Sequence, residues 1–367
     1  MNLECGQDLW EYLGESNKKI VLYGMGNGAD KILDVCRERG MVVSGIFASD
    51  GFARGNRFHG MEVLTWGKIK ERFGAENVIV LLAFGTSRSE VLENISRIAA
   101  EAELYAPDVP AFGEGVFDRA FFEAHRAELK TVWELLSDEE SRRIFACVVQ
   151  YKLTGRIEYL MQAESDPRRV MEELVCPNAL CSVADLGAYN GDTARALLDF
   201  EGSTVRRIYA MEPDPRNFRK LLSYAEGEER AKVIPYQAGA WCERATLSFD
   251  GSGNRNASFE SNRSSVLSSH PVKEKRIEAE TLDNFLAGAK VEHIKYDVEG
   301  SEREALLGSA NTIQSYRPSL LVSLYHRNED LFSLPLLIKE KFPFYRSFYL
   351  RRFRGVPAWD LNLYVME

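Results

Sequence analysis

Short apolar runs alternate with helix-forming stretches along the first third of the chain. Strands are predicted at residues 18–23, 42–47 and 78–84, with a helix after the first and another after the last. Strand–helix alternation of this kind is typical of a parallel sheet covered by helices. We therefore predict a small α/β domain over residues 1–112.

The pattern then changes to a run of helices. Proline and glycine at residues 107–115 mark a break, and residues 117–175 follow a helical period. Ser137 begins a capping box, and Asp166 precedes a proline at a first helical position. We interpret residues 113–178 as a helical connector that packs between domains, covers the entrance of the second domain's site or serves as a plain spacer.

Apolar strands and helices return after residue 179. Strands are predicted from residue 182 and at residues 207–211, 231–236, 295–298, 319–325, 345–350 and 362–366. Between them, short β-like stretches flank a serine-rich segment at residues 258–269. A polar segment of this length inside a compact domain is typical of a lid or a binding loop. We predict a second α/β domain over residues 179–367.

Length and composition limit the class of protein. The chain has 367 residues, enough for two domains, and its content of 45% hydrophobic and 28% charged residues is that of a globular protein. No apolar run approaches the roughly 18 residues of a membrane span. The N-terminus also lacks the basic and apolar regions of a secretion signal. We expect no membrane span and a cytoplasmic location.

The charges and cysteines argue against a nucleic-acid-binding protein and against a zinc site. A net charge of −9 argues against a nucleic-acid partner, because such binding depends on lysine and arginine neutralising phosphates. A basic cluster at residues 351–354 is interpreted either as the solvated rim of a hairpin or as a contact for an anionic substrate. The six cysteines include no Cys-x-x-Cys pair, so reduced thiols are expected rather than a zinc site.

Candidate chemistry begins at the turn after the strand that starts at residue 182. Gly187 and Gly191 allow the main chain to turn tightly and to approach a ligand. Asp192 and Thr193 can bond the free amides of the helix that they open. A diphosphate would be repelled by Asp192, whereas the ammonium group of S-adenosylmethionine (SAM) would be attracted. The spacing therefore favours SAM over a dinucleotide.

Two further strands of this domain end in acidic residues. Glu212 and Pro213 follow one strand, and a carboxylate at this place can accept hydrogen bonds from both hydroxyls of a ribose. Asp297 and Glu299 follow another strand. Ligands of open α/β sheets bind at the carboxyl ends of the strands, so we expect the three strand ends to face one crevice.

With these motifs, the second domain resembles the FkbM-type SAM-dependent methyltransferases. The resemblance is carried by residues 185–193, 211–218, 294–302 and 325–331. It implies a class I SAM methyltransferase fold, which is Rossmann-like and has a mostly parallel seven-stranded sheet closed by a C-terminal antiparallel hairpin. It also implies SAM as cofactor and O-methylation of a hydroxyl on a sugar, glycan or secondary metabolite. The residues expected to bind the cofactor are Asp185, Gly187, Ala188, Tyr189, Asn190, Gly191, Asp192, Thr193, Glu212, Pro213 and Asp297.

Three residues at the strand ends are candidates for catalysis. His326 is the first choice for the base that deprotonates the acceptor, because imidazole titrates near neutral pH. Asp297 is expected to orient the cofactor or acceptor, and Glu299 to assist. Lys295 is expected to form an ion pair in the crevice. Such a set can also hold Mg²⁺, but a metal is not favoured and no metal ligands are assigned.

The first domain leaves alternatives open. Its turn, Gly24-x-Gly26-x-x-Ala29, is a weak match to a Rossmann-like nucleotide site, with Asp50 at the place of a ribose-binding acid. One alternative is thus an NAD- or sugar-nucleotide-binding enzyme that uses this domain, and another is a non-catalytic SAM-binding protein. The expected partner is a small-molecule or saccharide acceptor, and a homo-oligomer remains open.

Overall fold

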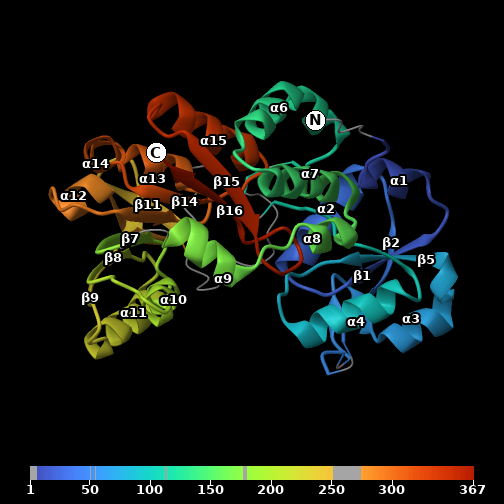
Figure 1. The fold of residues 1–367 in the computed structure, drawn as a ribbon. Coiled ribbons are helices and arrows are strands. Elements are labelled where there is room, and N and C mark those ends of the chain that lie inside the picture. Colours follow the sequence, from blue (N-terminus) through green and yellow to red (C-terminus); the bar gives the residue numbers. More distant parts are fainter. Residues whose placement is uncertain are drawn as a thin grey trace.

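The molecule contains two large sheets with a set of helices between them, and a small three-stranded sheet in its C-terminal half (Figure 1). The computed structural model describes residues 6–49, 51–53, 55–110, 112–113, 115–176, 180–250 and 274–367. The predicted serine-rich loop at residues 258–269 and the candidate acid Asp50 lie outside the described residues. No described helix is long and apolar enough to cross a membrane.

The N-terminal sheet has six strands in the order β3-β4-β2-β1-β5-β6. Its strands are β1 (Lys19–Tyr23), β2 (Val43–Phe47), β3 (Arg57–Phe58), β4 (Met61–Leu64), β5 (Val78–Leu82) and β6 (Glu103–Tyr105). Its helices are α1 (Leu9–Glu15), α2 (Asn27–Glu38), α3 (Trp66–Phe73) and α4 (Ser89–Ala99), and the 3₁₀ helix η1 (Ala75–Asn77) precedes β5. All pairings are parallel except that of β3 with β4. The predicted α/β architecture is confirmed, and β3, β4 and β6 are additions to the prediction.

The second sheet has seven strands in the order β15-β16-β14-β13-β7-β8-β9. These are β7 (Ser182–Leu186), β8 (Arg207–Met211), β9 (Lys232–Tyr236), β13 (His293–Tyr296), β14 (Ser319–Ser323), β15 (Ser347–Arg352) and β16 (Leu361–Met366). Strand β16 runs antiparallel to both of its neighbours, and the other pairings are parallel. The predicted mostly parallel sheet with a C-terminal antiparallel hairpin is confirmed.

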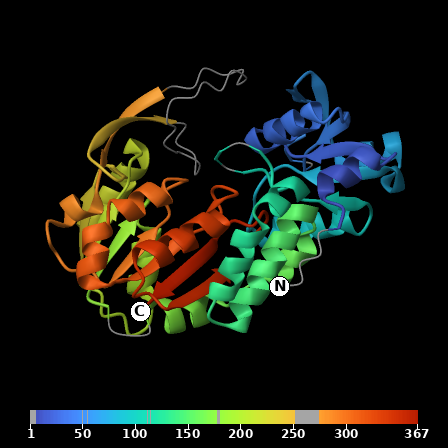
Figure 2. The same ribbon diagram turned by 90° about the horizontal axis from the view of Figure 1, so that it is seen from above.

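Helices and a small sheet complete the C-terminal half. The helices are α10 (Asp192–Asp199), α11 (Pro215–Gly227), α12 (Leu282–Leu286), α13 (Glu302–Leu307), α14 (Ala310–Tyr316) and α15 (Asp330–Lys341). The small sheet consists of β10 (Gly239–Ala240), β11 (Ala245–Asp250) and β12 (Glu274–Glu280), and it contains the two predicted β-like stretches. In the view from above, the N-terminal and C-terminal halves lie on opposite sides of the green helices (Figure 2).

The helical connector consists of short helices around one longer one. They are α5 (Arg119–Ala124), α6 (Arg126–Leu135), α7 (Glu139–Thr154), α8 (Ile157–Gln162), α9 (Pro167–Val170) and the π-helix η2 (Met171–Val175). Asp138 caps α7 by accepting the Ser141 amide at 2.7 Å, and Gly155 ends the helix with φ of +64°. The predicted capping signal is thus displaced by one residue, because Asp138 and not Ser137 is the cap.

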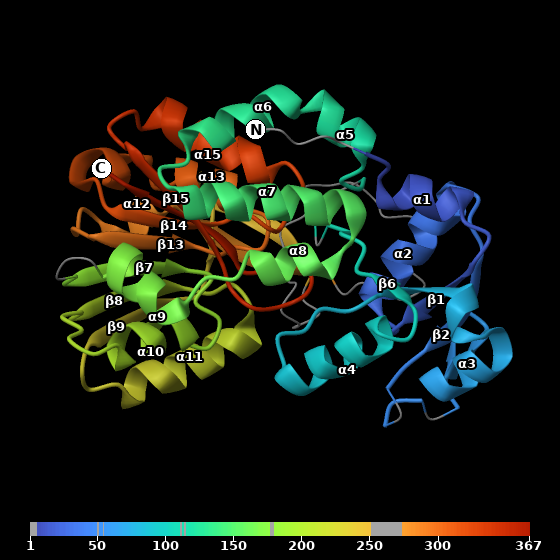
Figure 3. The same ribbon diagram turned by 45° about the vertical axis from the view of Figure 1, so that its right-hand side comes forward.

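The connector packs against the edge of the second sheet (Figure 3). The Phe348 amide of β15 donates to Ser137 Oγ at 2.8 Å, and the Leu350 amide donates to Ser141 Oγ at 2.9 Å. The Ser165 amide donates to the Arg352 carbonyl at 2.8 Å. The outward groups of an edge strand are thus satisfied by the connector, which is more than a plain spacer.

The basic cluster at residues 351–354 corrects one expectation. Arg351 and Arg352 are buried. An Nη atom of Arg351 lies 2.6 Å from Asp138 Oδ2, and Arg352 donates to the Leu160 carbonyl at 2.8 Å. These two arginines therefore hold the connector against β15, and the interpretation as a solvated rim or anionic-substrate contact is wrong for them. Arg354 alone of the three is exposed.

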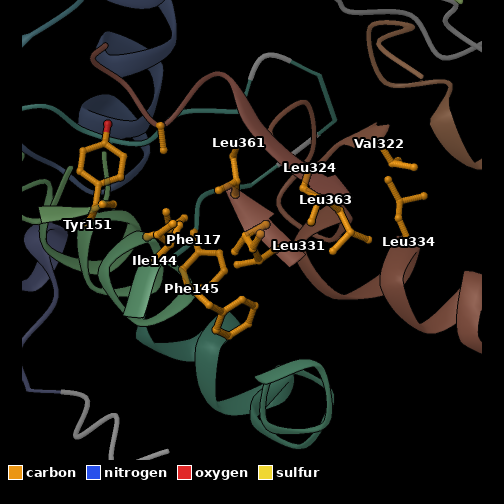
Figure 4. Packing of buried hydrophobic residues seen from close by; sticks show 14 of the residues in the cluster. Phe117, Ile144, Phe145, Tyr151, Val322, Leu324, Leu331, Leu334, Leu361 and Leu363 are labelled. Carbon is orange, nitrogen blue, oxygen red and sulfur yellow. The ribbon is translucent and has the colours of Figure 1, made fainter. Parts of the chain in front are cut away.

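A continuous apolar core joins the connector to both sheets. Phe117, Ile144 and Phe145 of the connector face Leu331, Leu361 and Leu363 of the C-terminal half (Figure 4). The same cluster of buried side chains continues to Val21 and Val80 in the N-terminal sheet.

Candidate active site

The turn after β7 brings the main chain close to the ends of β8 and β13. The amides of Gly187 and Ala188 donate to the Met211 carbonyl at 3.0 and 2.9 Å. Gly187 has φ of +84°, and a Cβ here would overlap the Asp297 carbonyl oxygen. Glycine is required because it accepts this φ and leaves room for the end of β13.

Helix α10 begins at the second glycine of the turn. Gly191, with φ of +84°, occupies the N-cap position, and Asp192 Oδ1 accepts the Thr193 amide at 2.9 Å. Asp192 thus satisfies one free amide of the helix, as expected. Its carboxylate also places negative charge at a helix N-terminus, where it is favourable.

Glu212 follows β8 and is buried at the edge of the turn. Its Oε2 accepts the Tyr189 amide at 2.8 Å, and its Oε1 accepts the Asp214 amide at 2.8 Å. Burial raises the pKa of Glu212 to about 7, although these amides oppose the shift. Each carboxylate oxygen has a second lone pair, so Glu212 can accept further hydrogen bonds from a ligand.

Lys295 on β13 links two carboxylates at the carboxyl end of the sheet. Its Nζ lies 3.4 Å from Asp185 Oδ1 and 3.3 Å from Asp297 Oδ2, which forms the predicted ion pair. Burial raises the pKa of Asp185, whereas Lys295 lowers it. Asp185 therefore lies beneath the turn and supports the site through Lys295.

Asp297 is held as an anion by its neighbours. Its Oδ1 accepts hydrogen bonds from Tyr325 Oη at 2.7 Å and Ser323 Oγ at 3.1 Å. Burial acts to raise its pKa, but Lys295, His326 and these hydroxyls lower the pKa to about 2. A carboxylate with so low a pKa is a weak base, and Asp297 is better suited to orienting a ligand.

His326 is buried among three carboxylates. Its Nδ1 lies 2.9 Å from Glu302 Oε1, and its Nε2 lies 3.4 Å from Glu299 Oε2 and 3.6 Å from Asp297 Oδ1. Burial acts to lower its pKa, but Glu302 and Glu299 raise the pKa well above the ordinary value. The neighbouring carboxylates therefore favour the protonated form of the imidazole.

The main-chain turn after β13 is closed by Glu302, a residue to which the sequence analysis gave no role. Glu302 Oε1 accepts the amides of Val298 at 2.9 Å and Gly300 at 3.4 Å, and it also meets the ring of His326. Glu302 is 1% exposed. One buried carboxylate thus fixes both the turn and the imidazole.

Glu299 stands at the tip of this turn. Its φ of +55° is costly for a residue other than glycine, by roughly 1–2 kcal/mol. Burial raises the pKa of Glu299, while the neighbouring His326 lowers it. Of the two carboxylates predicted to be catalytic, Glu299 has the raised pKa and is therefore a stronger base than Asp297.

A cavity of about 530 Å³ lies over these strand ends. It is lined by the predicted residues Gly187, Tyr189, Asp192, Thr193, Glu212, Pro213, Asp297, Glu299 and His326. Four other predicted residues, Asp185, Ala188, Asn190 and Gly191, are not among its lining residues and lie in or beneath the turn. The cavity is also lined by Ser87, Tyr325, Trp359 and Asn362, which the sequence analysis did not assign to the site.

A metal site is not evident in the part of the chain that the structure describes. No group of three or more His, Cys, Asp or Glu side chains is arranged there to hold a metal ion. Cys36, Cys147, Cys176, Cys181 and Cys242 are free thiols.

The glycine turn of the first domain borders a smaller cavity of about 180 Å³. Gly24 and Gly26 have φ of +114° and +113°. A Cβ at Gly28 would overlap the Ala83 carbonyl, so this glycine serves close packing of α2 on the end of β5. Packing alone thus accounts for part of the glycine pattern.

Comparison with known proteins relates the second half of the chain to one family. Residues 185–353 match the family model of the Methyltransferase FkbM domain. A search of curated proteins by sequence finds no match to the chain.

The chain is also similar to solved structures, and the first of these shares its fold over most of the chain. Methyltransferase FkbM from Methylobacillus flagellatus KT is similar over 95% of this chain and 90% of its own, with a TM-score of 0.69 and 19% sequence identity. Fibrillarin from Aeropyrum pernix, solved with natively bound S-adenosyl-L-methionine, is similar over 51% of this chain and 66% of its own, with a TM-score of 0.32 and 13% identity. A SAM-dependent methyltransferase from Aquifex aeolicus is similar over 55% of this chain and 92% of its own, with a TM-score of 0.27 and 12% identity.

Proposed function

We propose that this chain, whose residues 185–353 form an FkbM methyltransferase domain, transfers the methyl group of SAM to a hydroxyl of a sugar, glycan or secondary metabolite. The observation that carries the proposal is the position of Glu299, a half-buried carboxylate that lines the cavity beside Asp297, lies 3.4 Å from the His326 imidazole and has a raised pKa. An alcohol must lose its proton as its oxygen attacks carbon, and a carboxylate with a raised pKa is a stronger base than an ordinary one.

The residues at the ends of β7 and β8 fit SAM. Glu212 offers carboxylate oxygens to the two ribose hydroxyls, and the main chain of Gly187 lines the same cavity. Asp192 provides negative charge for the ammonium group. Bound SAM supplies a methyl carbon that its sulfonium already activates.

The protein's own residues position the acceptor and move its proton. Glu299 accepts the hydroxyl proton, and the imidazolium of His326 stays beside it as a fixed positive charge. Asp297 remains an anion and, together with the Tyr325 hydroxyl, orients the acceptor. This assignment replaces the hypothesis of His326 as base, because a ring that Glu302 and Glu299 keep protonated has no lone pair to offer.

Labelled methyl transfer tests the proposal. Saccharides and hydroxylated metabolites are incubated with the protein and methyl-labelled SAM, and an alkali-stable methyl ether is expected. Release of labelled methanol by mild alkali would indicate a methyl ester and contradict hydroxyl methylation.

A substitution tests the base. Glu299→Gln is expected to lower kcat by about 100- to 10,000-fold, the usual contribution of general base catalysis. The dissociation constant of S-adenosylhomocysteine (SAH), measured by calorimetry, should stay within about twofold. Full activity of this variant would remove Glu299 from the mechanism.

Two alternatives give different results. A non-catalytic SAM-binding protein would bind SAH and transfer no methyl group to any acceptor. An NAD-linked enzyme would be stabilised in a thermal melt by NAD(H) and not by SAH.

A further inference from the structure

The large cavity extends well beyond the cofactor-binding strands. Glu212 follows β8, whereas Asn362 lies on β16, and β7, β13 and β14 stand between these two strands. Four strand spacings correspond to roughly 19 Å. The cavity thus has a cofactor side at β7 and β8 and a far side at β14 and β16, with Asp297 and Glu299 between them.

The far side is built by both halves of the molecule. Ser87 belongs to the loop after β5 in the N-terminal domain, and Trp359 belongs to the loop between β15 and β16. The amide of Thr86 donates to the Val356 carbonyl at 2.7 Å, and the amide of Val356 donates to the Thr86 carbonyl at 2.9 Å. These two hydrogen bonds form an antiparallel bridge that fastens one loop to the other.

Trp359 lies where the two loops meet. Its indole covers Gly85 so closely that a Cβ at that position would overlap the ring. Trp359 also lines both the large cavity and the smaller cavity of the N-terminal domain. Gly85 of the first domain therefore determines the position of the Trp359 indole, which forms one side of the large cavity.

The chemistry of the far side suits an uncharged ligand. Around Trp359 the lining includes Tyr325, Asp360 and Asn362, which combine aromatic faces with hydrogen-bond acceptors. The described lining residues include two cations, Lys295 and His326, and both already face carboxylates. Arg351 and Arg352 are buried against the connector. Among the lining residues that the structure describes, an anionic acceptor would meet carboxylates and only these two paired cations.

We propose that the far side is an acceptor subsite shared by the two domains, in which Trp359, held by the loop at Gly85, selects an uncharged, polyhydroxylated ring. One face of the ring packs on the indole, and the hydroxyls bond to carboxylate and amide oxygens. The proposal rests on the methyltransferase function proposed above. It gives the N-terminal domain a role in choosing the acceptor.

The charge of the acceptor is tested first. Small molecules and glycans extracted from the organism that makes the protein are passed over anion- and cation-exchange resins, and each fraction is incubated with the full chain and tritium-labelled SAM. Label in the unretained, uncharged fraction is expected. Label confined to a retained fraction would overturn the proposal, and no label in any fraction, with SAH bound normally, would overturn the proposed function itself.

A double-mutant cycle then tests the shared wall. Trp359→Ala and Gly85→Ala are each expected to slow methylation of the labelled fraction at least tenfold, while the SAH dissociation constant stays within about twofold. Because Gly85→Ala acts by moving the indole, the double variant should be no slower than Trp359→Ala. Gly67→Ala on α3, where an added Cβ meets open space apart from one contact with Thr65, is the matched control.

Two results would refute the shared subsite. One is a wild-type rate for Gly85→Ala. The other is a double variant in which the rate of methylation falls by the product of the two single fold-decreases. Independent effects of this kind would mean that the loop does not act through Trp359.

Discussion

At the scale of residues, the ionisation of the site is set by contacts between elements. Glu302, at the start of α13, accepts two amides of the turn that carries Glu299 and meets the imidazole of His326. His326 in turn lies beside Glu299 and Asp297. A substitution of Glu302 is therefore expected to change the electrostatic surroundings of His326, Glu299 and Asp297.

Glu302→Gln tests this chain of contacts. Glu302 is the leading cause that raises the pKa of His326, so the variant should lose the imidazolium charge near neutral pH. Without that charge, the pKa of Glu299 should rise further, and the acid limb of the kcat–pH profile should move to higher pH. Unchanged SAH affinity is the control for folding. An unshifted acid limb would limit Glu302 to a structural role.

Cofactor binding should depend on the protonation of Glu212. Its pKa of about 7 in the folded protein means that the carboxylate form is lost as pH falls below 7. SAH affinity should therefore weaken by up to tenfold per pH unit below this point, as calorimetry at pH 6, 7 and 8 would reveal. Glu212→Gln should remove the pH dependence, and Glu212→Ala should weaken binding at least tenfold, about 1.4 kcal/mol. Equal wild-type affinity at the three pH values would contradict the assignment.

Sequence reasoning works for residues whose role follows from their place at a strand end. The placement of Gly187, Asp192 and Glu212 around one cavity was predictable in this way, because the carboxyl edge of a parallel sheet gathers such positions. The ionisation of His326 was not predictable, since it depends on a carboxylate from a separate helix. Trp359 was missed because its position depends on a loop of the other domain.

At the scale of elements, helix α7 connects the segment before the connector to the turn after β14, which carries His326. Lys152 Nζ lies 2.5 Å from Asp108 Oδ2 and 3.4 Å from Asn328 Oδ1, and all three side chains are buried. A few residues after Asp108, the amide of Phe112 donates to the carbonyl of His326 at 3.1 Å. Helix α7 thus supports the main chain on both sides of the imidazole.

Removal of the Lys152 charge should destabilise the protein strongly. Lys152→Met leaves the buried carboxylate of Asp108 unpaired, and we expect a loss of about 3 kcal/mol in the free energy of unfolding, measured by urea denaturation. Lys130→Met on α6 removes an exposed lysine and should change it by less than about 1 kcal/mol. Similar decreases in the free energy of unfolding for the two variants would show that the buried Lys152–Asp108 pair does not stabilise the protein.

Buried strands such as β5 could be predicted because their apolar runs are nearly continuous. The strands β3 and β6 were too short to give a periodic signal. Arg351 and Arg352 look like surface residues in the sequence, and their burial depends on the acceptors that α7 and α8 bring to β15.

At the scale of the whole molecule, one apolar cluster crosses the boundaries that the sequence suggests. Val80 of the first sheet, Phe145 of the connector and Leu363 of the second sheet belong to the same cluster of buried residues. Separation of the halves would expose this surface to water at a cost of about 25 cal/mol per Å². The two halves should therefore behave as one cooperative unit.

Calorimetry can test this cooperativity. The full chain should unfold in a single transition whose calorimetric and van't Hoff enthalpies agree, and SAH should raise the midpoint of the whole transition. Two transitions, with SAH shifting one alone, would contradict the expectation.

The edges of the seven-stranded sheet restrict how copies of this chain can assemble. On one edge, the outward amides of Phe348 and Leu350 are taken up by serine hydroxyls. On the other, β9 carries Pro235, which has no amide hydrogen. Both margins thus lack part of the free amide row that a second molecule would pair with, so a dimer that continues the sheet from copy to copy is disfavoured, as is fibril growth by strand addition. Assembly of this protein would then use its helical or loop surfaces or the edges of its other two sheets.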